Sequence, residues 1–249
     1  MSLLAIDSNA KTVKGREFGA ITGIMYLSPS DLSGVVNVCP MAEIAGCKKG
    51  CLNTAGRGVM GPVQKGRLRK TLHYQNDYEK FMNELVKDIV SVVTKAKNNG
   101  AKPMIRLNGT SDIAWERKGF TLEEARAKRM GVEAKYYNNL MELFPDVQFY
   151  DYTKIAGRFN KNLPKNYDLT FSYSGVESYQ KQVDFAIKKG ARIAVVFRDE
   201  NFPEEFMGMK TVDGDEHDIR PFNPQGVVVA LKAKGKARYD TSGFVVDAE

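Results

Sequence analysis

The sequence contains few residues of several types on which common enzyme sites depend. Its 249 residues include two histidines, one tryptophan and three cysteines. It has no serine–histidine–aspartate array, no glycine-rich phosphate loop of the GxxxxGK[ST] type and no dinucleotide fingerprint. These absences argue against triad hydrolases, P-loop enzymes and Rossmann dehydrogenases. The two histidines also leave histidine-based acid–base catalysis few positions in this chain.

Long apolar segments are missing as well. No run approaches the roughly 20 residues that cross a bilayer, and the first residues lack the basic and apolar regions of a secretory signal. We therefore expect a cytoplasmic protein with reduced thiols and no membrane partner. The odd cysteine count argues against a disulfide framework. The composition, 43% hydrophobic and 27% charged, is typical of globular proteins, and no linker interrupts it, so we expect one domain over residues 1–249.

The three cysteines are the most informative feature that is present. Cys39, Cys47 and Cys51 fall within thirteen residues in the pattern C-x7-C-x3-C. Clustered thiolates commonly hold a soft metal or an iron–sulfur cluster. The pattern matches neither zinc-finger knuckles nor the ferredoxin run. Three protein ligands also leave a four-coordinate centre with one open position, as catalytic sites require. These residues are therefore the predicted metal ligands.

A [4Fe-4S] cluster is the favoured occupant of this loop, because zinc would need a fourth cysteine or histidine nearby. His73 lies 22 residues after Cys51, so a zinc site stays an alternative. The glycine-containing residues 53–58 follow the last cysteine. Their backbone N–H groups can approach sulfides or an anion, and Arg57 can balance cluster charge. An ordinary flexible loop explains the same composition.

Apolar runs and helical periodicities alternate along the chain. We expect strands at residues 19–27, 103–107, 147–152, 167–173, 191–197 and 226–231, and helices at 76–99, 121–145 and 177–189. This alternation indicates a parallel sheet with right-handed crossovers. The predicted fold is therefore α/β, with roughly six mostly parallel strands in an open or partial (β/α) barrel.

Polar residues follow several predicted strands, where parallel β/α folds place their sites. The candidates are Asn108, Gly109, Thr110, Ser111 and Asp112, then Thr153 and Lys154, then Ser172 and Ser174, and finally Arg198 and Asp199. We expect the cysteine loop to lie at this edge, close to the first two groups. Ligand binding competes with a strand-to-helix cap at 108–112, and with a solvated lysine at Lys154. Trp115 fits either ligand stacking or a lid over the core.

The chain is basic, with a net charge of +7 and a pI near 9.1. Its densest basic runs are residues 65–70, just after the cysteines, and residues 232–238. Such a surface attracts anions, including nucleic acid, although a solvated charged face is an equal interpretation. His217 lies in an acidic stretch, residues 213–218, that resembles a divalent-cation loop by composition only.

The order of first strand, cysteine loop, helix and further β/α units resembles the radical S-adenosylmethionine superfamily. The resemblance implies a partial six-strand barrel, a [4Fe-4S] cluster on three thiolates and S-adenosylmethionine on the fourth iron. Residues 106–112 stand where that family contacts the methionyl amine, and Tyr173-Ser174-Gly175 ends the fourth strand where it has a polar turn. The superfamily spacing is C-x3-C-x2-C, which differs from the spacing here, and Thr-Ser-Asp replaces its glutamate.

A closer resemblance is carried by longer strings. The segments CPMAEIAGCKKGCLNTAGRG, RLNGTSD and FYDYTK resemble the bacteriophage gene product 88 family over most of the chain. This resemblance implies a phage protein working in the host cytoplasm, and it implies no particular activity.

The leading hypothesis is a radical-S-adenosylmethionine-like [4Fe-4S] protein in which a small molecule binds at the cluster. Whether it is an enzyme stays open. Asn108, Asp112, Lys154 and Ser172 are its predicted positioning groups. The alternatives are a non-catalytic iron–sulfur or zinc protein that binds nucleic acid, and a zinc-stabilised module that binds a protein partner.

Overall fold

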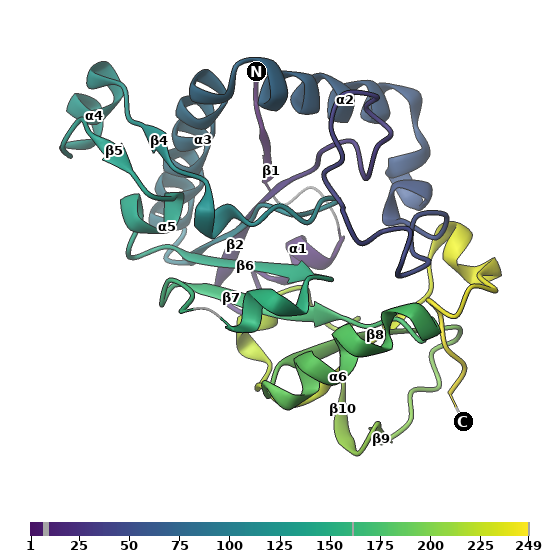
Figure 1. Cartoon of the computed structure of the whole chain (residues 1–249). Helices are drawn as coiled ribbons and strands as arrows, with labels where there is room; N and C mark the ends of the chain where they lie inside the picture. Colours follow the sequence, from purple (N-terminus) through teal and green to yellow (C-terminus); the bar gives the residue numbers. More distant parts are fainter. Residues whose placement is uncertain (7–9, 161, 249) are drawn as a thin grey trace.

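The computed structural model describes residues 1–6, 10–160 and 162–248, and its centre is a nine-stranded sheet (Figure 1). The strands are β1 (Leu4–Ile6), β2 (Ala20–Met25), β3 (Lys102–Arg106), β6 (Gln148–Thr153), β7 (Tyr167–Ser172), β8 (Arg192–Phe197), β9 (Glu205–Phe206), β10 (Met209–Asp213) and β11 (Val228–Lys232). A separate two-stranded sheet pairs β4 (Phe120–Thr121) with β5 (Tyr136–Tyr137).

The sheet is mostly parallel, and all six predicted strands are present in it. Strands β2, β3, β6, β7, β8 and β11 are neighbours in chain order and run parallel. Strand β10 extends this series beyond β11 in parallel orientation, while β1 and β9 pair antiparallel at the two ends. Strands β1, β9 and β10 were not predicted, because β1 and β9 have only three and two residues and β10 mixes polar with apolar residues.

Six α-helices accompany the sheet within the described residues. They are α1 (Ala10–Lys14), α2 (Gly61–Asn76), α3 (Tyr78–Asn98), α4 (Glu124–Met130), α5 (Leu140–Leu143) and α6 (Gln180–Lys188). The predicted helices at 76–99 and 177–189 correspond to α3 and α6. Helix α2 was not predicted, because its buried side chains are Arg67, Thr71 and Tyr74 instead of an aliphatic stripe. In Figure 1, α2 and α3 lie along one side of the sheet.

The long helix predicted over residues 121–145 is wrong. The segment instead folds as β4, α4, β5 and α5. Gly131 takes a φ of +68° and ends α4 after seven residues. The side chain of Asn83 in α3 donates to the Thr121 carbonyl and accepts from the Glu123 N–H, so it binds the chain just before α4. Contacts with α3 therefore fix the start of α4.

The two faces of the sheet differ in polarity. One face packs on the helices through aliphatic and aromatic side chains such as Ile105, Phe149 and Phe171. The opposite face carries alternate residues of the same strands, among them Arg106, Tyr150 and Arg192. We call this second surface the polar face. Ile219 packs on it against Ala20, Met104 and Tyr150, so the segment after β10 covers part of it.

We predict opposite effects for alanine at two glycines. A Cβ on Gly23 in β2 would stand 2.7 Å from Cγ2 of Val92 in α3, whereas nothing lies within 4 Å of a Cβ on Gly66 in α2. Gly23→Ala should lower the free energy of unfolding by about 1–3 kcal/mol through overpacking. Gly66→Ala should raise it by roughly 0.5–1 kcal/mol through helix propensity. Urea titrations measure both; equal responses would contradict the described packing.

Candidate functional site

The cysteine loop lies across the carboxyl ends of the central strands, as the sequence predicts. The Cys39 Sγ is 3.6 Å from the Thr110 carbonyl oxygen, beyond the end of β3. The Asp112 N–H donates to the Val38 carbonyl at 2.7 Å. Farther along the loop, the Ser174 hydroxyl donates to the Ala45 carbonyl at 2.8 Å, beyond the end of β7. The loop therefore reaches from the end of β3 to the end of β7 and is hydrogen-bonded to the segments that follow both strands.

The three thiols are free, half-buried and close enough to influence one another electrostatically. Burial raises the pKa of Cys39 to about 12, and a negative charge on either of the other cysteines would raise it further. Burial also raises the pKa of Cys47 and Cys51. Each thiol is therefore protonated near neutral pH unless a cation binds. A metal would displace these protons, because thiolates are the ligands.

No three histidine, cysteine, aspartate or glutamate side chains in the described residues are arranged to hold a single metal ion. His73, the candidate fourth zinc ligand, lies instead beside Glu84 at 3.4 Å and Asp77 at 3.8 Å. The structure thus does not bring His73 into a site with the thiols.

Two cations lie beside the thiols. Lys154, after β6, donates from Nζ to the carbonyls of Ser172 and Tyr173 at 3.2 and 3.1 Å. Burial lowers the pKa of Lys154, while the Cys47 thiolate and the Asp112 carboxylate would favour its charged form. The Arg67 guanidinium, from α2, donates to Asn53 Oδ1 and is likewise favoured by a Cys51 thiolate. Neither residue is an ordinary solvated cation.

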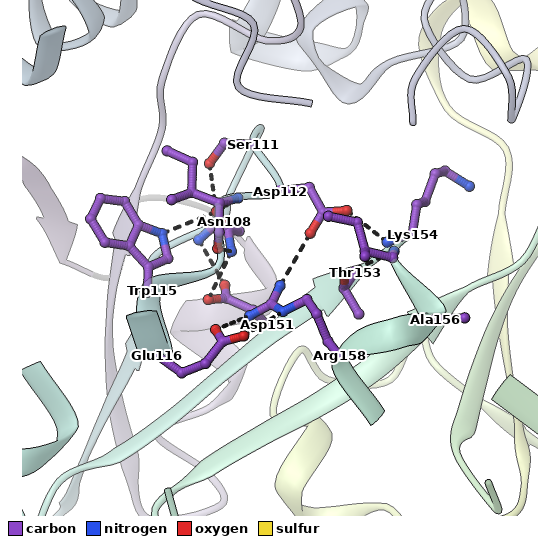
Figure 2. Close-up of polar contacts among 12 residues, drawn as sticks. Asn108, Ser111, Asp112, Trp115, Glu116, Asp151, Thr153, Lys154, Ala156 and Arg158 are labelled. Carbon is purple, nitrogen blue, oxygen red and sulfur yellow. Dashed lines mark hydrogen bonds and ion pairs between the residues drawn. The ribbon is translucent and has the colours of Figure 1, made fainter. Parts of the chain in front are cut away.

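The turn after β3 uses most of its polar groups internally. Asn108 Oδ1 accepts from the Ser111 hydroxyl at 2.8 Å and from the Trp115 indole at 3.1 Å (Figure 2). The Thr110 hydroxyl donates to the Leu27 carbonyl at 2.6 Å. Gly109 is required sterically, since a Cβ there would stand 2.5 Å from the Met25 carbonyl oxygen. These groups build the turn and seat Trp115 in it; a role for them in ligand binding stays a prediction.

Asp112 is held by a buried ionic network that the sequence did not predict. Its Oδ2 accepts from the Lys154 backbone N–H at 2.7 Å, and its Oδ1 accepts from Arg158 Nη1 at 3.2 Å. Arg158 is 1% exposed, and it also donates to Glu116 at 2.7 Å and to the Tyr167 hydroxyl at 3.0 Å. Figure 2 shows Arg158 between the two carboxylates. No local sequence signal marks this pairing, because its members are 42 and 46 residues apart.

Asp151 lies below the same turn. Burial raises its pKa to about 7, although the Asn108 N–H, the Tyr167 hydroxyl and the Arg106 and Arg158 charges all favour the carboxylate. The Asp151 carboxylate holds Asn108 through its backbone and its side chain, at 2.7 and 3.2 Å. It therefore fixes the turn beside the cysteine loop.

The acidic stretch around His217 does not form a metal site. Asp215 accepts from the Lys232 N–H and from Lys234 Nζ, at 2.8 and 2.9 Å. Asp218 accepts from Arg106 at 2.8 Å. Two of the carboxylates considered as cation ligands are thus already bonded to the protein's own donors.

The chain belongs to the gene product 88 family, whose model matches residues 2–248. No curated protein and no solved structure matches the chain significantly. The comparisons therefore confirm the phage family and give no support to the resemblance in layout to the radical S-adenosylmethionine superfamily. Every helix in the described ranges is too short or too polar to cross a membrane.

Arg158→Met should lower the free energy of unfolding by about 3–5 kcal/mol, because it leaves buried carboxylates unpaired. Burial already raises the pKa of Asp112, and loss of the Arg158 charge would raise it further, so the loss should be largest above neutrality and shrink as pH falls. Denaturation at several pH values measures this.

Arg117→Met is the matched control. Arg117 is half-exposed and lies 3.9 Å from the same Glu116, so its loss should cost less than about 1 kcal/mol. A pH-independent loss in the Arg158 variant would contradict the ionic origin of the effect.

Proposed function

We propose that this protein binds a [4Fe-4S] cluster through Cys39, Cys47 and Cys51. The observation that carries the proposal is the grouping of three half-buried thiols on one loop at the carboxyl edge of a parallel sheet. Clusters favour thiolate ligands, and this donor set contains no other kind of side chain. The chain would hold the cluster where β/α folds place their sites.

The charges beside the thiols support a cluster. Three thiolates bring three negative charges into a partly buried place, which is unfavourable without compensation. Lys154 and Arg67 lie where they can offset that charge, next to Cys47 and Cys51 respectively. Hydrogen bonds and charges around cluster sulfurs also set the reduction potential. These two residues are therefore the proposed electrostatic partners of the cluster.

Three protein thiolates leave one iron open to another ligand, and the cluster would supply one-electron chemistry there. We propose S-adenosylmethionine as that ligand, with the sheet forming the partial barrel of a radical-S-adenosylmethionine-like protein. The sequential order of the six central parallel strands supports this interpretation. The loop Asn108–Asp112 and the end of β7 at Ser172 would form the walls around the bound molecule. The reduced thiols suit the cytoplasm of the host cell.

A non-catalytic role in nucleic-acid binding is the second candidate. Arg57, Lys65 and Arg69 are exposed on and just before α2, directly after the last cysteine. A basic helix of this kind can contact phosphates. Such binding would weaken steeply with salt, and S-adenosylmethionine would not be consumed.

Protein made and purified anaerobically should be brown and contain close to four irons and four sulfides per chain. Cys39→Ala, Cys47→Ala and Cys51→Ala should each abolish or destabilise the centre, because each removes one bond. Lys49→Ala is the matched control, since Lys49 is an exposed loop residue without a thiol. Iron, sulfide and optical assays measure the outcome; a colourless protein with one zinc would refute the cluster.

Lys154→Met should lower the reduction potential of the cluster. The reduced cluster carries one more negative charge, and the ammonium group next to Cys47 stabilises that charge. Lys48→Met, which removes an exposed loop cation paired with Asp31 and Glu43, should change the potential less. Anaerobic redox titration followed by electron paramagnetic resonance distinguishes the two variants. Equal potentials would remove Lys154 from the proposed site.

S-adenosylmethionine should alter the electron paramagnetic resonance spectrum of the reduced cluster and yield 5′-deoxyadenosine under reduction. An unchanged spectrum with no nucleoside product would leave the cluster protein without this enzymatic role. Binding of nucleic acid that falls steeply with salt would then favour the second candidate.

A further inference from the structure

The polar face of the sheet contains a group of buried polar atoms without partners. Thr22 Oγ1, Arg106 Nε and the Tyr150 hydroxyl on β2, β3 and β6 make no hydrogen bond of good geometry in the described structure. Arg220, on the segment that covers this face, contributes two more such atoms, Nε and Nη1. Buried polar groups are nearly always satisfied in native proteins, so these five atoms need an explanation.

Arg220 is the central member of this group. It is 0% exposed, and its bonds within the described residues are to the backbone oxygens of Gly214 and His217 and to the His217 ring. No carboxylate of the described residues lies within ion-pair distance of it. A buried charge without a counter-ion is strongly unfavourable. Within the part of the chain that the structure describes, the guanidinium therefore lacks the negative partner that its burial requires.

The neighbouring charges do not supply that partner. Arg106 is paired with Asp218 at 2.8 Å, and Arg192 is paired with Asp168 at 2.7 Å. Asp218 and Asp168 are thus each already paired with another arginine. Among the described residues of this region, the three arginines Arg106, Arg192 and Arg220 face the two aspartates Asp168 and Asp218, which leaves one positive charge in excess. That excess resides at Arg220.

The unpartnered groups lie close together. The Tyr152 ring is 4.6 Å from the Arg106 guanidinium. Its hydroxyl is influenced by the charges of Arg220, Asp218, Arg106 and Arg192, in that order. Ile219, adjacent to Arg220, packs against Tyr150. The Tyr150 and Thr22 hydroxyls approach each other without reaching the geometry of a hydrogen bond. Donors from two arginines and a tyrosine thus surround one region of the polar face.

From this geometry we infer a binding site for the oxyanion group, phosphate or carboxylate, of a small ligand on the polar face, with Arg220 and Arg106 as its cationic donors. Guanidinium groups match planar and tetrahedral oxyanions through paired N–H bonds. The Tyr150 hydroxyl would donate a further bond. A cation is disfavoured at the same place by the excess positive charge. The inference does not depend on the cysteine loop, since none of its donors comes from that loop.

The site would nevertheless serve a ligand that extends toward the cysteines. The charge of Arg106 is influenced by Tyr26, at the end of β2, and the Tyr26 ring lies 5.1 Å from the Arg67 guanidinium beside Cys51. Tyr152 and Ser172 are only partly buried on the same face. An anionic ligand held at Arg220 can thus direct its other end to the carboxyl edge of the sheet.

The test measures binding of inorganic phosphate and of acetate, as separate probes, to the full chain. Chloride is the background anion and keeps the ionic strength constant. Calorimetry should show saturable binding of at least one probe, and the stronger probe identifies the oxyanion class. Arg220→Met should weaken that binding about tenfold or more through loss of a charged hydrogen-bonding partner. In chloride buffer without phosphate or acetate, the melting temperature of Arg220→Met should not fall below that of the wild type, because an uncompensated buried charge has been removed.

Arg129→Met is the control for net charge, since Arg129 is exposed on α4, and its binding should equal that of the wild type. Tyr150→Phe gives a second test if Arg220→Met does not fold. It should weaken binding about threefold to tenfold without lowering the melting temperature. Tyr167→Phe should lower the melting temperature and leave oxyanion binding unchanged, because the Tyr167 hydroxyl is bonded to Asp151 and Arg158. No saturable binding, or equal binding by wild type, Arg220→Met and Tyr150→Phe, would overturn the inference.

Discussion

The ion pairs of Arg158 are the interaction on which the geometry of the cysteine site depends. Arg158 follows β6, and its guanidinium joins Asp112 and Glu116 of the segment after β3. Asp112 also accepts the Lys154 N–H, so the ends of the two strands are held in a fixed relation. The Thr110 carbonyl that contacts the Cys39 thiol belongs to the same turn. The buried ion pairs of Arg158 thus position the cysteine loop, although no charged residue of that loop takes part in them.

The distribution of buried charge over the sheet follows from this arrangement. On the helix-covered side, Arg158 has two carboxylates and a tyrosine hydroxyl, so its burial is compensated. On the polar face, Arg192 is compensated by Asp168, while Arg220 has no carboxylate partner among the described residues. Fully compensated networks make a fold rigid, whereas uncompensated groups mark places where a ligand can complete the structure. The network around Arg158 and the proposed site at Arg220 thus differ in whether the buried charge is paired within the described residues.

The sequence predicts the strands well and the side-chain network poorly. Continuous apolar runs such as Arg192–Phe197 are recognisable because a strand buried on both faces needs no alternation. Helix α2 was not predicted, because the residues that it buries, such as Arg67 and Tyr74, do not form an apolar pattern with helical periodicity. The segment from 121 to 145 has helix-forming residues, yet contacts with Asn83 and a left-handed Gly131 divide it. Tertiary contacts overrode local propensity there.

The candidate site was predictable only in part, for a related reason. Clustering in sequence reveals the cysteines, and the rule for strand ends places them near Asp112 and Lys154. The roles of Arg158, Glu116 and Asp151 depend on partners tens of residues away, which no local pattern records.

The attachment of the cysteine loop bears on how it would take up a cluster. Ser174, Ser178 and Ser242 donate to the carbonyls of Ala45, Ile44 and Gly46. The loop is thus held between the end of β7 and the C-terminal segment by bonds that involve no thiol. Small zinc domains behave differently, because metal binding supplies their folding free energy. Here the protein's own hydrogen bonds hold the loop that carries the thiols. A bound metal would therefore have to displace the thiol protons but would not have to fold the loop.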